Sequence, residues 1–350
     1  MTEPKALKVG ILGATGAVGE QMMIVLAERN FPVAELRLFG SSRSAGSKLA
    51  FKGKEYEVEE ASLERMKGLD LLLGAADNDV AKKFLPDAAK LGVTVVDNSS
   101  AFRLDPEVPL VIPEVNPEDV KWSKGLIANP NCATIIGLTA IAPLHRKAKV
   151  KRLIASTYQA VSGAGKGGID ELEAEVKAPA GTPAPCKVFP YPIAYNLIPQ
   201  IGGFNDEAYT SEEMKMQNEG RKMLHDDNLL VSCTCVRVPV FYGHSESVNI
   251  ETERKLSAKE ARAILAQAPG VQVYDNPSEK MYPLAVDAAG EDATYVGRIR
   301  EDDTIPNGLN MWIVADNIRK GAALNAVQIA EELVRRDLLG VKDRTVFIKK

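Results

Sequence analysis

Short apolar runs alternate with longer amphipathic stretches through the first third of the chain. Residues 8–12, 35–40, 69–76 and 93–97 are rich in Val, Ile and Leu, which predicts buried strands. Residues 20–29 and 80–91 instead carry apolar side chains at helical spacing. Strands and helices that alternate in this way are typical of a parallel sheet covered by helices. The pattern therefore predicts a Rossmann-like, doubly wound α/β domain.

The pattern changes after residue 150. A long strand is predicted over residues 151–159, followed by a glycine-rich turn and a helix over residues 169–177. Six prolines within residues 177–199 exclude regular structure there and favour an extended excursion, which is compatible with a subunit interface. Further strands are predicted over residues 248–252 and 309–315. This half is predicted to form an α+β domain that carries the chemistry and the dimer contacts.

The length of the chain supports two domains, since 350 residues exceed what one hydrophobic core usually accommodates. We predict a nucleotide-binding domain of residues 1–131 and a catalytic and dimerisation domain of residues 132–316. An amphipathic C-terminal helix within residues 317–350 is expected to pack back on the first domain and complete it.

Composition narrows the possible functions. An apolar share of 45% and a charged share of 26% are those of an ordinary globular protein. The net charge of −4 argues against nucleic acid or an anionic membrane as the main partner, and no apolar run approaches membrane-spanning length. Four cysteines without Cys-x-x-Cys spacing predict neither a disulfide framework nor a zinc site, so we expect no metal and a cytoplasmic location.

A glycine turn joins the first predicted strand to the first predicted helix. Its spacing is Gly-x-x-Gly-x-x-Gly, one residue longer than the commoner dinucleotide fingerprint. Glycines let the backbone approach a pyrophosphate at a helix N-terminus, whose N–H groups attract anions. The residues predicted to bind the dinucleotide here are Gly13, Thr15, Gly16, Ala17 and Val18.

The segment after the second predicted strand indicates which dinucleotide is bound. An NAD site usually places an acidic residue there, to accept hydrogen bonds from the ribose 2′-hydroxyl. Residues 41–46 contain hydroxyls and a guanidinium but no acid. Ser41, Arg43 and Ser44 suit a 2′-phosphate, so NADP is predicted over NAD. A solvated polar loop is the alternative interpretation.

Cys132 lies where an irregular segment, Asn129-Pro130-Asn131, precedes an apolar run over residues 135–141. A thiol in the first turn of a helix meets unpaired N–H groups and the positive end of the helix dipole, and both stabilise the thiolate. The alternative is a buried cysteine that packs as a small hydrophobe. His244 is one of three histidines and is the natural acid–base partner for a cysteine nucleophile at neutral pH, although a lone histidine is more often structural.

Three charged positions are further candidates. Arg103 follows a predicted strand at the sheet edge where ligands bind, so it either anchors an anion or pairs with a nearby acid. Thr210 and Glu213 match a helix capping box, which accounts for Glu213. Glu212 and Lys215 share a helix face, and they either pair with each other or bind a ligand.

Together these motifs resemble the aspartate-β-semialdehyde dehydrogenases of bacteria, along nearly the whole chain. The matching segments are residues 13–19, 129–132, 158–165 and 212–215, with Arg237 and the pair Gly243-His244. The resemblance implies NADP-dependent, reversible reductive dephosphorylation of L-4-aspartyl phosphate to aspartate semialdehyde. It places that reaction on the route to lysine, threonine and methionine, with inorganic phosphate as co-substrate and a homodimer or dimer of dimers as the assembly.

The resemblance also implies roles for individual residues. Cys132 would attack the aldehyde and form an acyl-thioester after hydride transfer, with His244 as general base and phosphate opening the thioester. The remaining assignments are Asn131 and Gln159 beside the nucleophile, Arg237 for the α-carboxylate, Glu212 for the α-ammonium, Arg103 and Lys215 for phosphate, and Ser162, Gly163 and Asn317 for the cofactor. Glu213 competes with Glu212 for the ammonium.

Two other functions remain as alternatives. An N-acetylglutamyl-phosphate reductase has a similar plan, but it normally places glycine before the cysteine, where this chain has Asn131. A non-catalytic NADP-binding homologue would have no need to retain Cys132, Gln159, Arg237 and His244 together.

Overall fold

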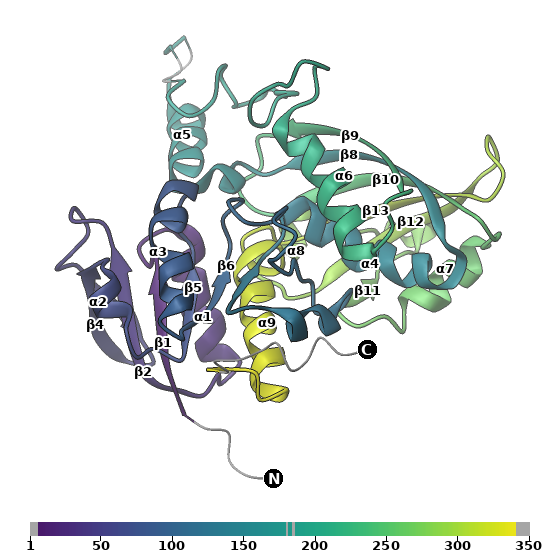
Figure 1. Ribbon diagram of the computed structural model, residues 1–350. Coiled ribbons are helices and arrows are strands. Elements are labelled where there is room, and N and C mark those ends of the chain that lie inside the picture. Colours follow the sequence, from purple (N-terminus) through teal and green to yellow (C-terminus); the bar gives the residue numbers. More distant parts are fainter. Residues whose placement is uncertain (1–5, 180, 184–185, 341–350) are drawn as a thin grey trace. The chain divides into compact units, whose positions relative to one another are not determined.

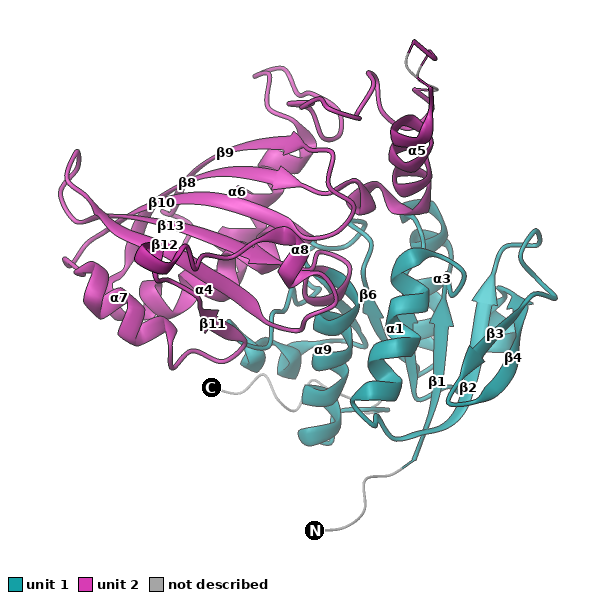
Figure 2. Ribbon diagram, turned by 180° about the vertical axis from the view of Figure 1, so that it is seen from behind, with its two compact units in different colours: residues 1–130, 322–350 teal, residues 131–321 magenta. Residues whose placement is uncertain are grey.

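The computed structural model describes residues 6–179, 181–183 and 186–340. The chain divides into two compact units (Figures 1 and 2). Unit 1 consists of Met1–Pro130 and Ala322–Lys350, and unit 2 consists of Asn131–Gly321. Each unit has its own sheet, as the predicted combination of a Rossmann-like domain and an α+β domain requires, so the predicted fold class is confirmed.

In the described residues, unit 1 contains a seven-stranded sheet with the order β3-β4-β2-β1-β5-β6-β7. All neighbouring strands are parallel except β3 and β4, which form an antiparallel pair at one edge. The strands are β1 (Leu7–Leu12), β2 (Val33–Gly40), β3 (Lys48–Phe51), β4 (Lys54–Glu60), β5 (Leu71–Gly74), β6 (Thr94–Asp97) and β7 (Leu126–Ala128).

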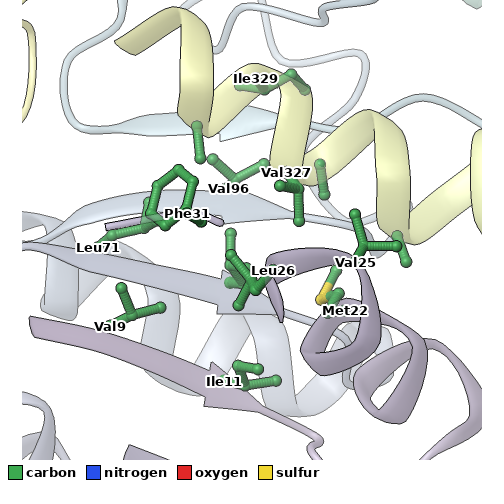
Figure 3. Close-up of a cluster of buried hydrophobic side chains, with 14 of the residues drawn as sticks. Val9, Ile11, Met22, Val25, Leu26, Phe31, Leu71, Val96, Val327 and Ile329 are labelled. Carbon is green, nitrogen blue, oxygen red and sulfur yellow. The ribbon is translucent and has the colours of Figure 1, made fainter. Parts of the chain in front are cut away.

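The helices of unit 1 cover this sheet. They are α1 (Ala17–Glu28), α2 (Leu63–Met66), α3 (Asn78–Lys90), the 3-10 helix η1 (Pro117–Trp122) and α9 (Leu324–Arg335). Leu26 of α1 and Val327 of α9 lie fully buried in one cluster with Val9 and Val96 of the strands (Figure 3). The C-terminal helix therefore supplies part of the core of unit 1.

In the described residues, unit 2 contains a six-stranded mixed sheet with the order β11-β12-β13-β10-β8-β9. The strands are β8 (Val150–Gln159), β9 (Leu230–Arg237), β10 (His244–Thr252), β11 (Val271–Val273), β12 (Thr294–Asp302) and β13 (Gly308–Ala315). Strand β10 is antiparallel to both β8 and β13, whereas β8 and β9 run parallel and end at Gln159 and Arg237 in register. The polar residues that end β8 and β9 are thereby brought side by side.

Three helices, α4 (Cys132–Ala148), α6 (Ser211–Leu224) and α7 (Ala258–Leu265), contact the sheet of unit 2 and lie on one face of it (Figure 1). The opposite face is left uncovered by these helices (Figure 2). The other helical segments are η2 (Val161–Ala164), α5 (Gly165–Lys177), η3 (Pro277–Glu279), α8 (Ala285–Ala288) and a π-helical turn, η4 (Arg319–Ala323).

Candidate active site

Asn131 fixes the start of helix α4 and so the direction of Cys132. Its extended backbone lets the side-chain Oδ1 accept hydrogen bonds from the N–H groups of Ala133 (3.1 Å) and Thr134 (3.2 Å), which makes it the N-cap. Its Nδ2 donates to Glu212 Oε1 at 2.8 Å, and its backbone N–H donates to Glu219 Oε2 at 2.7 Å. Two buried carboxylates of α6 therefore hold the residue before the cysteine.

Cys132 and His244 contact each other, as their predicted partnership requires. The Cys132 Sγ lies 3.4 Å from His244 Nε2, and the other ring nitrogen, Nδ1, accepts a hydrogen bond from the Ala160 N–H at 3.0 Å. Burial, together with the positive charge of Arg237, lowers the pKa of His244 from 6.5 to about 3, against an opposing effect of Glu212. His244 is fully buried and is the first residue of β10, which begins four residues before the strand predicted from residue 248.

Two glycines allow other segments to approach this pair closely. A Cβ on Gly321 would lie 2.9 Å from the Cβ of Cys132. A Cβ on Gly163 would lie 2.7 Å from Arg237 Nη1 and 3.3 Å from His244 Nε2. Any side chain at either position would displace a predicted site residue.

Asn317 connects the η2 turn to the strand that carries His244. Its Oδ1 accepts a hydrogen bond from the Gly243 N–H at 3.0 Å, and its Nδ2 donates to Ser162 Oγ at 3.0 Å. The helix expected from residue 317 begins differently, because the Gly321 N–H donates to the Asp316 carbonyl in a π-helical turn and α9 starts only at Leu324. The predicted contact of Ser162, Gly163 and Asn317 with the cofactor stays a prediction.

Arg237 and Gln159, which end the neighbouring strands β9 and β8, lie beside the nucleophile pair. Arg237 is buried, donates from Nη1 to the Ala160 carbonyl at 2.6 Å, and has a pKa lowered by that burial. The Nε2 of Gln159 lies 3.4 Å from Glu212 Oε1. A buried guanidinium beside a buried carboxylate suits the carboxylate and ammonium groups of an amino acid.

Glu212 forms an ion pair with Lys215 at 2.8 Å, which is one of the two alternatives that the helix spacing left open. Burial acts to raise the pKa of Glu212, but Lys215, Asn131 and Arg237 overcome it and hold the pKa at about 2. Glu213 is occupied elsewhere: it forms the predicted capping box with Thr210 and accepts a hydrogen bond from the Cys235 N–H at 3.0 Å. Of the two neighbouring carboxylates, only Glu212 lies beside Asn131 and Gln159.

Arg103 belongs to unit 1. It is buried, and it donates from Nε to the Asn129 carbonyl and from Nη2 to the Asn98 carbonyl, both at 2.9 Å. Glu107, an acid four residues after Arg103 in the sequence, pairs with Lys124. Arg103 thus ties together the segments that follow β6 and β7, and its predicted phosphate contact stays a prediction.

A hollow of about 470 Å³ in unit 1 surrounds the predicted dinucleotide site. Gly13 adopts a φ of +84° and Gly16 caps α1 without a side-chain bond, so the first turn of α1, which starts with Ala17 and Val18, keeps N–H groups available for a phosphate. The predicted residues that line the hollow are Gly13, Thr15, Gly16, Ser41, Arg43 and Ser44. Glu60 and Lys83 line it too, and the sequence did not indicate them because they come from β4 and α3.

The chain is similar to known proteins along most of its length. Residues 8–123 match the family model "Semialdehyde dehydrogenase, NAD binding domain", and residues 141–320 match "Semialdehyde dehydrogenase, dimerisation domain". The chain is 54% identical to the aspartate-semialdehyde dehydrogenase of Aquifex aeolicus, covering 95% of this chain and 99% of that protein. The chain belongs to the aspartate-semialdehyde dehydrogenase family. The resemblance inferred from the motifs is therefore confirmed.

Two other members of the family are also similar to this chain over nearly its whole length. The aspartate-semialdehyde dehydrogenase of Bacillus subtilis is 46% identical, with 96% of this chain and 99% of that protein covered. A crystal structure of aspartate semialdehyde dehydrogenase II from Vibrio cholerae, complexed with ASA, superimposes with a TM-score of 0.91 at 46% identity, covering 95% of this chain and 99% of that one. Unit 1 thus contains an NAD(P)-binding domain of this family, and unit 2 contains its dimerisation domain.

Two further classes of feature are absent from the part of the chain that the structure describes. None of its helices is both long and apolar enough to span a bilayer. No group of three or more His, Cys, Asp or Glu side chains in that part is arranged to hold a metal ion.

The sequence analysis missed Glu246, which lies on the same face of β10 as His244. Glu246 is fully buried, and neither of its carboxyl oxygens has a hydrogen-bond partner among the described residues. Helix α4 passes so close that a Cβ on Gly137 would lie 2.8 Å from Glu246 Oε2. Burial raises the pKa of this carboxyl well above 4.5, and Cys235 adds to the effect. Glu246, Val248 and Ile250 occupy every second position of the sequence, and this alternation would have indicated that the side chain of Glu246 points to the buried face of the strand.

We predict that Glu246→Gln makes the stability of the protein less dependent on pH. A carboxyl whose pKa is raised in the folded state binds its proton there while the unfolded chain releases it, so the wild-type protein loses stability as the pH rises from about 4.5. The loss amounts to at most about 1.4 kcal/mol per pH unit. The free energy of unfolding of unit 2, obtained from urea unfolding of the protein between about pH 5 and pH 8, measures this loss. The exposed Glu253→Gln is the control, and equal slopes for all three proteins would contradict a neutral Glu246.

Proposed function

We propose that the chain is an aspartate-semialdehyde dehydrogenase that interconverts L-4-aspartyl phosphate and aspartate semialdehyde in the synthesis of lysine, threonine and methionine. The observation that carries the proposal is the 3.4 Å contact between Cys132 Sγ and His244 Nε2 at the start of α4, beside buried Arg237 and Glu212. A reactive sulfur next to groups that suit an amino-acid head is what this reaction needs.

Cys132 is the proposed nucleophile. Its sulfur adds to the aldehyde carbon, and the adduct becomes a thioester when a hydride leaves the carbon. NADP supplies the hydride acceptor when it is bound. Phosphate then attacks the thioester carbon and releases the sulfur, so one difficult step is divided into two easier ones. Asn131, which precedes Cys132, and Gln159, whose Nε2 lies 3.4 Å from Glu212 Oε1, are proposed to hold the substrate in line with the sulfur.

The substrate head is proposed to bind Arg237 and Glu212. The guanidinium of Arg237 offers donors to the α-carboxylate, and Glu212, whose low pKa keeps it ionised, attracts the α-ammonium. Lys215, held against Glu212 but partly exposed, is proposed to bind phosphate. The same role is proposed for Arg103 of unit 1.

NADP is the proposed cofactor. The hollow in unit 1 fits a dinucleotide, since the glycine turn and the open N-terminus of α1 suit a pyrophosphate. Arg43 in the loop after β2 suits a 2′-phosphate, whereas Glu60 in the same hollow provides the acid that an NAD site would use. The preference for NADP or NAD then depends on which of the two side chains, Arg43 or Glu60, contacts the 2′ position of the ribose. Ser162, Gly163 and Asn317 of unit 2 remain proposed contacts of the nicotinamide end.

A homodimer, or a dimer of dimers, is the proposed assembly. The register of β8, β10 and β13 places Tyr158 and Trp312 on the sheet face opposite to Glu246, which lies against α4, and their ring centroids are 5.6 Å apart. Several large apolar side chains of the proline-rich excursion are also exposed, including Tyr195 at 90% and Leu197 at 58%. The free state of all four cysteines supports a reducing, cytoplasmic setting.

The proposed function is tested by an assay for phosphate-dependent reduction of NADP. We expect sustained reduction only when aspartate semialdehyde and phosphate are both present, because phosphate must open the thioester before Cys132 can react again. Turnover that ignores phosphate would indicate a hydrolytic aldehyde dehydrogenase instead. Preference for N-acetylglutamate semialdehyde would favour the reductase alternative, and no turnover with either aldehyde would favour a non-catalytic homologue.

Replacing Cys132 by Ala is expected to reduce turnover by more than about a thousandfold, because no other group can form the thioester. NADP binding, measured by fluorescence titration, should stay unchanged, since the proposed NADP contacts do not include Cys132. Cys233→Ala, which removes a buried thiol of β9, is the matched control and should keep most of the activity. Near wild-type turnover in Cys132→Ala would refute the nucleophile assignment.

Replacing Arg43 by Ala is expected to weaken NADP binding by about tenfold or more, since a hydrogen bond to a charged group contributes about 1.5–3 kcal/mol. Binding of NAD, which has no 2′-phosphate, should change little. Isothermal titration with both dinucleotides gives the comparison. Lys82→Ala, an exposed change on α3 that does not line the hollow, is the control. Equal losses for the two dinucleotides would mean that Arg43 does not contact the 2′-phosphate.

A further inference from the structure

The guanidinium of Arg237 borders a hollow of about 490 Å³ in unit 2. Within the described residues its side chain makes one hydrogen bond, from Nη1 to the Ala160 carbonyl at 2.6 Å. The remaining N–H groups are therefore available for the carboxylate of a substrate. Because a long side chain beside an open space can rotate into it, the neighbours of Arg237 on the side of the hollow decide where these donors point.

Phe189, in the proline-rich excursion, is the neighbour that borders both the guanidinium and the hollow. The centroid of its ring lies 6.0 Å from Arg237 Cζ, within reach of the attraction between a cation and an aromatic face. Gly168 of α5 approaches the tip of the ring, since a Cβ on this glycine would lie 3.1 Å from Phe189 Cζ. The ring therefore has little room to move away from the guanidinium. It is buried in an apolar cluster with Val161, Leu172, Ile193 and Ile198.

Glu171 of α5 fixes the backbone that carries this ring. Its buried carboxylate accepts hydrogen bonds from three consecutive backbone N–H groups. The N–H groups of Lys187 and Val188 donate to Oε2 at 2.8 and 2.7 Å, and that of Phe189 donates to Oε1 at 3.1 Å. Hydrogen bonds to a carboxylate are stronger than those between neutral groups. A segment without regular structure is thus anchored at the residue whose ring borders Arg237.

The same excursion also pairs with the backbone of Arg237. The Ile198 N–H donates to the Arg237 carbonyl at 3.0 Å, and the Arg237 N–H donates to the Ile198 carbonyl at 2.8 Å. The next turn of α5 adds a further anchor, because Glu175 Oε2 accepts hydrogen bonds from the N–H groups of Ile193 and Ala194 at 2.8 and 2.7 Å. The excursion therefore contacts Arg237 at its backbone and at its guanidinium, and α5 holds the excursion between these two points.

We propose that Phe189 positions Arg237 for the α-carboxylate of the substrate, and so helps the enzyme to select an aldehyde that carries an amino-acid head. The proposal rests on the proposed function, which assigns that carboxylate to Arg237. The ring keeps the guanidinium out of the hollow, so its donors are oriented before the substrate binds and less conformational freedom is lost on binding. Glu171 acts one step further away, because it holds the backbone of Phe189. Both are positioning residues and do not touch the substrate.

Replacing Phe189 by Leu keeps an apolar side chain in the cluster but removes the ring. We expect the KM for aspartate semialdehyde to rise by about tenfold while kcat stays within about twofold, because the carboxylate is bound equally in the ground state and the transition state. The control is Leu172→Ala, which removes packing from the same apolar cluster and should leave KM nearly unchanged. Equal rises of KM in the two variants would mean that Phe189 only fills space, and would overturn the proposal.

Two comparisons show whether the effect passes through Arg237 and the carboxylate. Phe189→Leu should add little to the loss of kcat/KM that Arg237→Lys causes, because changes that act through one contact are not additive. The aldehyde 3-aminopropanal has the ammonium group of aspartate semialdehyde but lacks its α-carboxylate, so its kcat/KM should be the same in Phe189→Leu and in the wild type. Fully additive losses, or an equal loss of kcat/KM with both aldehydes, would contradict the proposal. If 3-aminopropanal is not turned over, the cycle with Arg237→Lys decides.

The rate at which phenylglyoxal modifies Arg237, followed by peptide mass spectrometry, gives a readout that does not depend on turnover. The reagent adds to guanidinium groups that it can reach, so the rate should rise severalfold in Phe189→Leu. It should also rise in Glu171→Gln, whose amide N–H groups cannot accept the backbone hydrogen bonds. Glu173→Gln, an exposed change on α5, is the control. Unchanged rates in both test variants would refute the positioning role.

Failure of the proposed function is distinguishable from failure of this proposal. If the proposed function is wrong, the wild-type protein will not turn over aspartate semialdehyde, whereas the rates of Arg237 modification will still differ between the variants as described. If only the positioning role is wrong, the wild-type protein will be active, and Phe189→Leu will match it in both KM and modification rate.

Discussion

The pair of hydrogen bonds that Asn131 makes with helix α6 is the constraint on which the rest of the site depends. Its amide donates to Glu212 and its backbone N–H to Glu219, and both acceptors are buried. Burying a carboxylate is unfavourable unless it is hydrogen-bonded, so these contacts satisfy the carboxylates while they fix Asn131. Because Asn131 is also the N-cap of α4, the point where that helix begins is fixed with it. The position of the Cys132 sulfur relative to His244 follows from the start of the helix.

Glu212 serves the fold and the proposed chemistry together. It accepts from Asn131, lies close to Gln159 and pairs with Lys215, so its negative charge is shared before any substrate arrives. The ammonium of the proposed substrate would join this set as one more donor. A carboxylate whose partners already hold it in place loses little conformational freedom when the substrate binds, which is the advantage of a preorganised site.

The sequence predicted those features that depend on local pattern. Strands β1, β2, β5 and β6 of unit 1, the glycine turn after β1 and the capping box of Thr210 and Glu213 follow from periodicity and from the chemistry of single residues, whereas β3, β4 and β7 were not predicted. Cys132 and His244 were recognisable as partners because few residue types can do their work. The sequence did not predict Glu219 or the Ala160 N–H, since their roles depend on which segments meet in space. A backbone N–H in particular has no side chain to indicate it, and the close approach of Gly321 to Cys132 is likewise a tertiary contact without a local pattern.

The spacing of the two carboxylates on α6 has a consequence for how the chain can vary in length. Glu212 and Glu219 are seven residues apart, about two helical turns, so they project from the same side of the helix. One inserted or deleted residue between them would rotate one carboxylate by about 100° relative to the other. Asn131 could then keep only one of its two partners. The number of residues between these two carboxylates therefore determines whether both can reach Asn131, and with it where the neighbouring helix α4 starts.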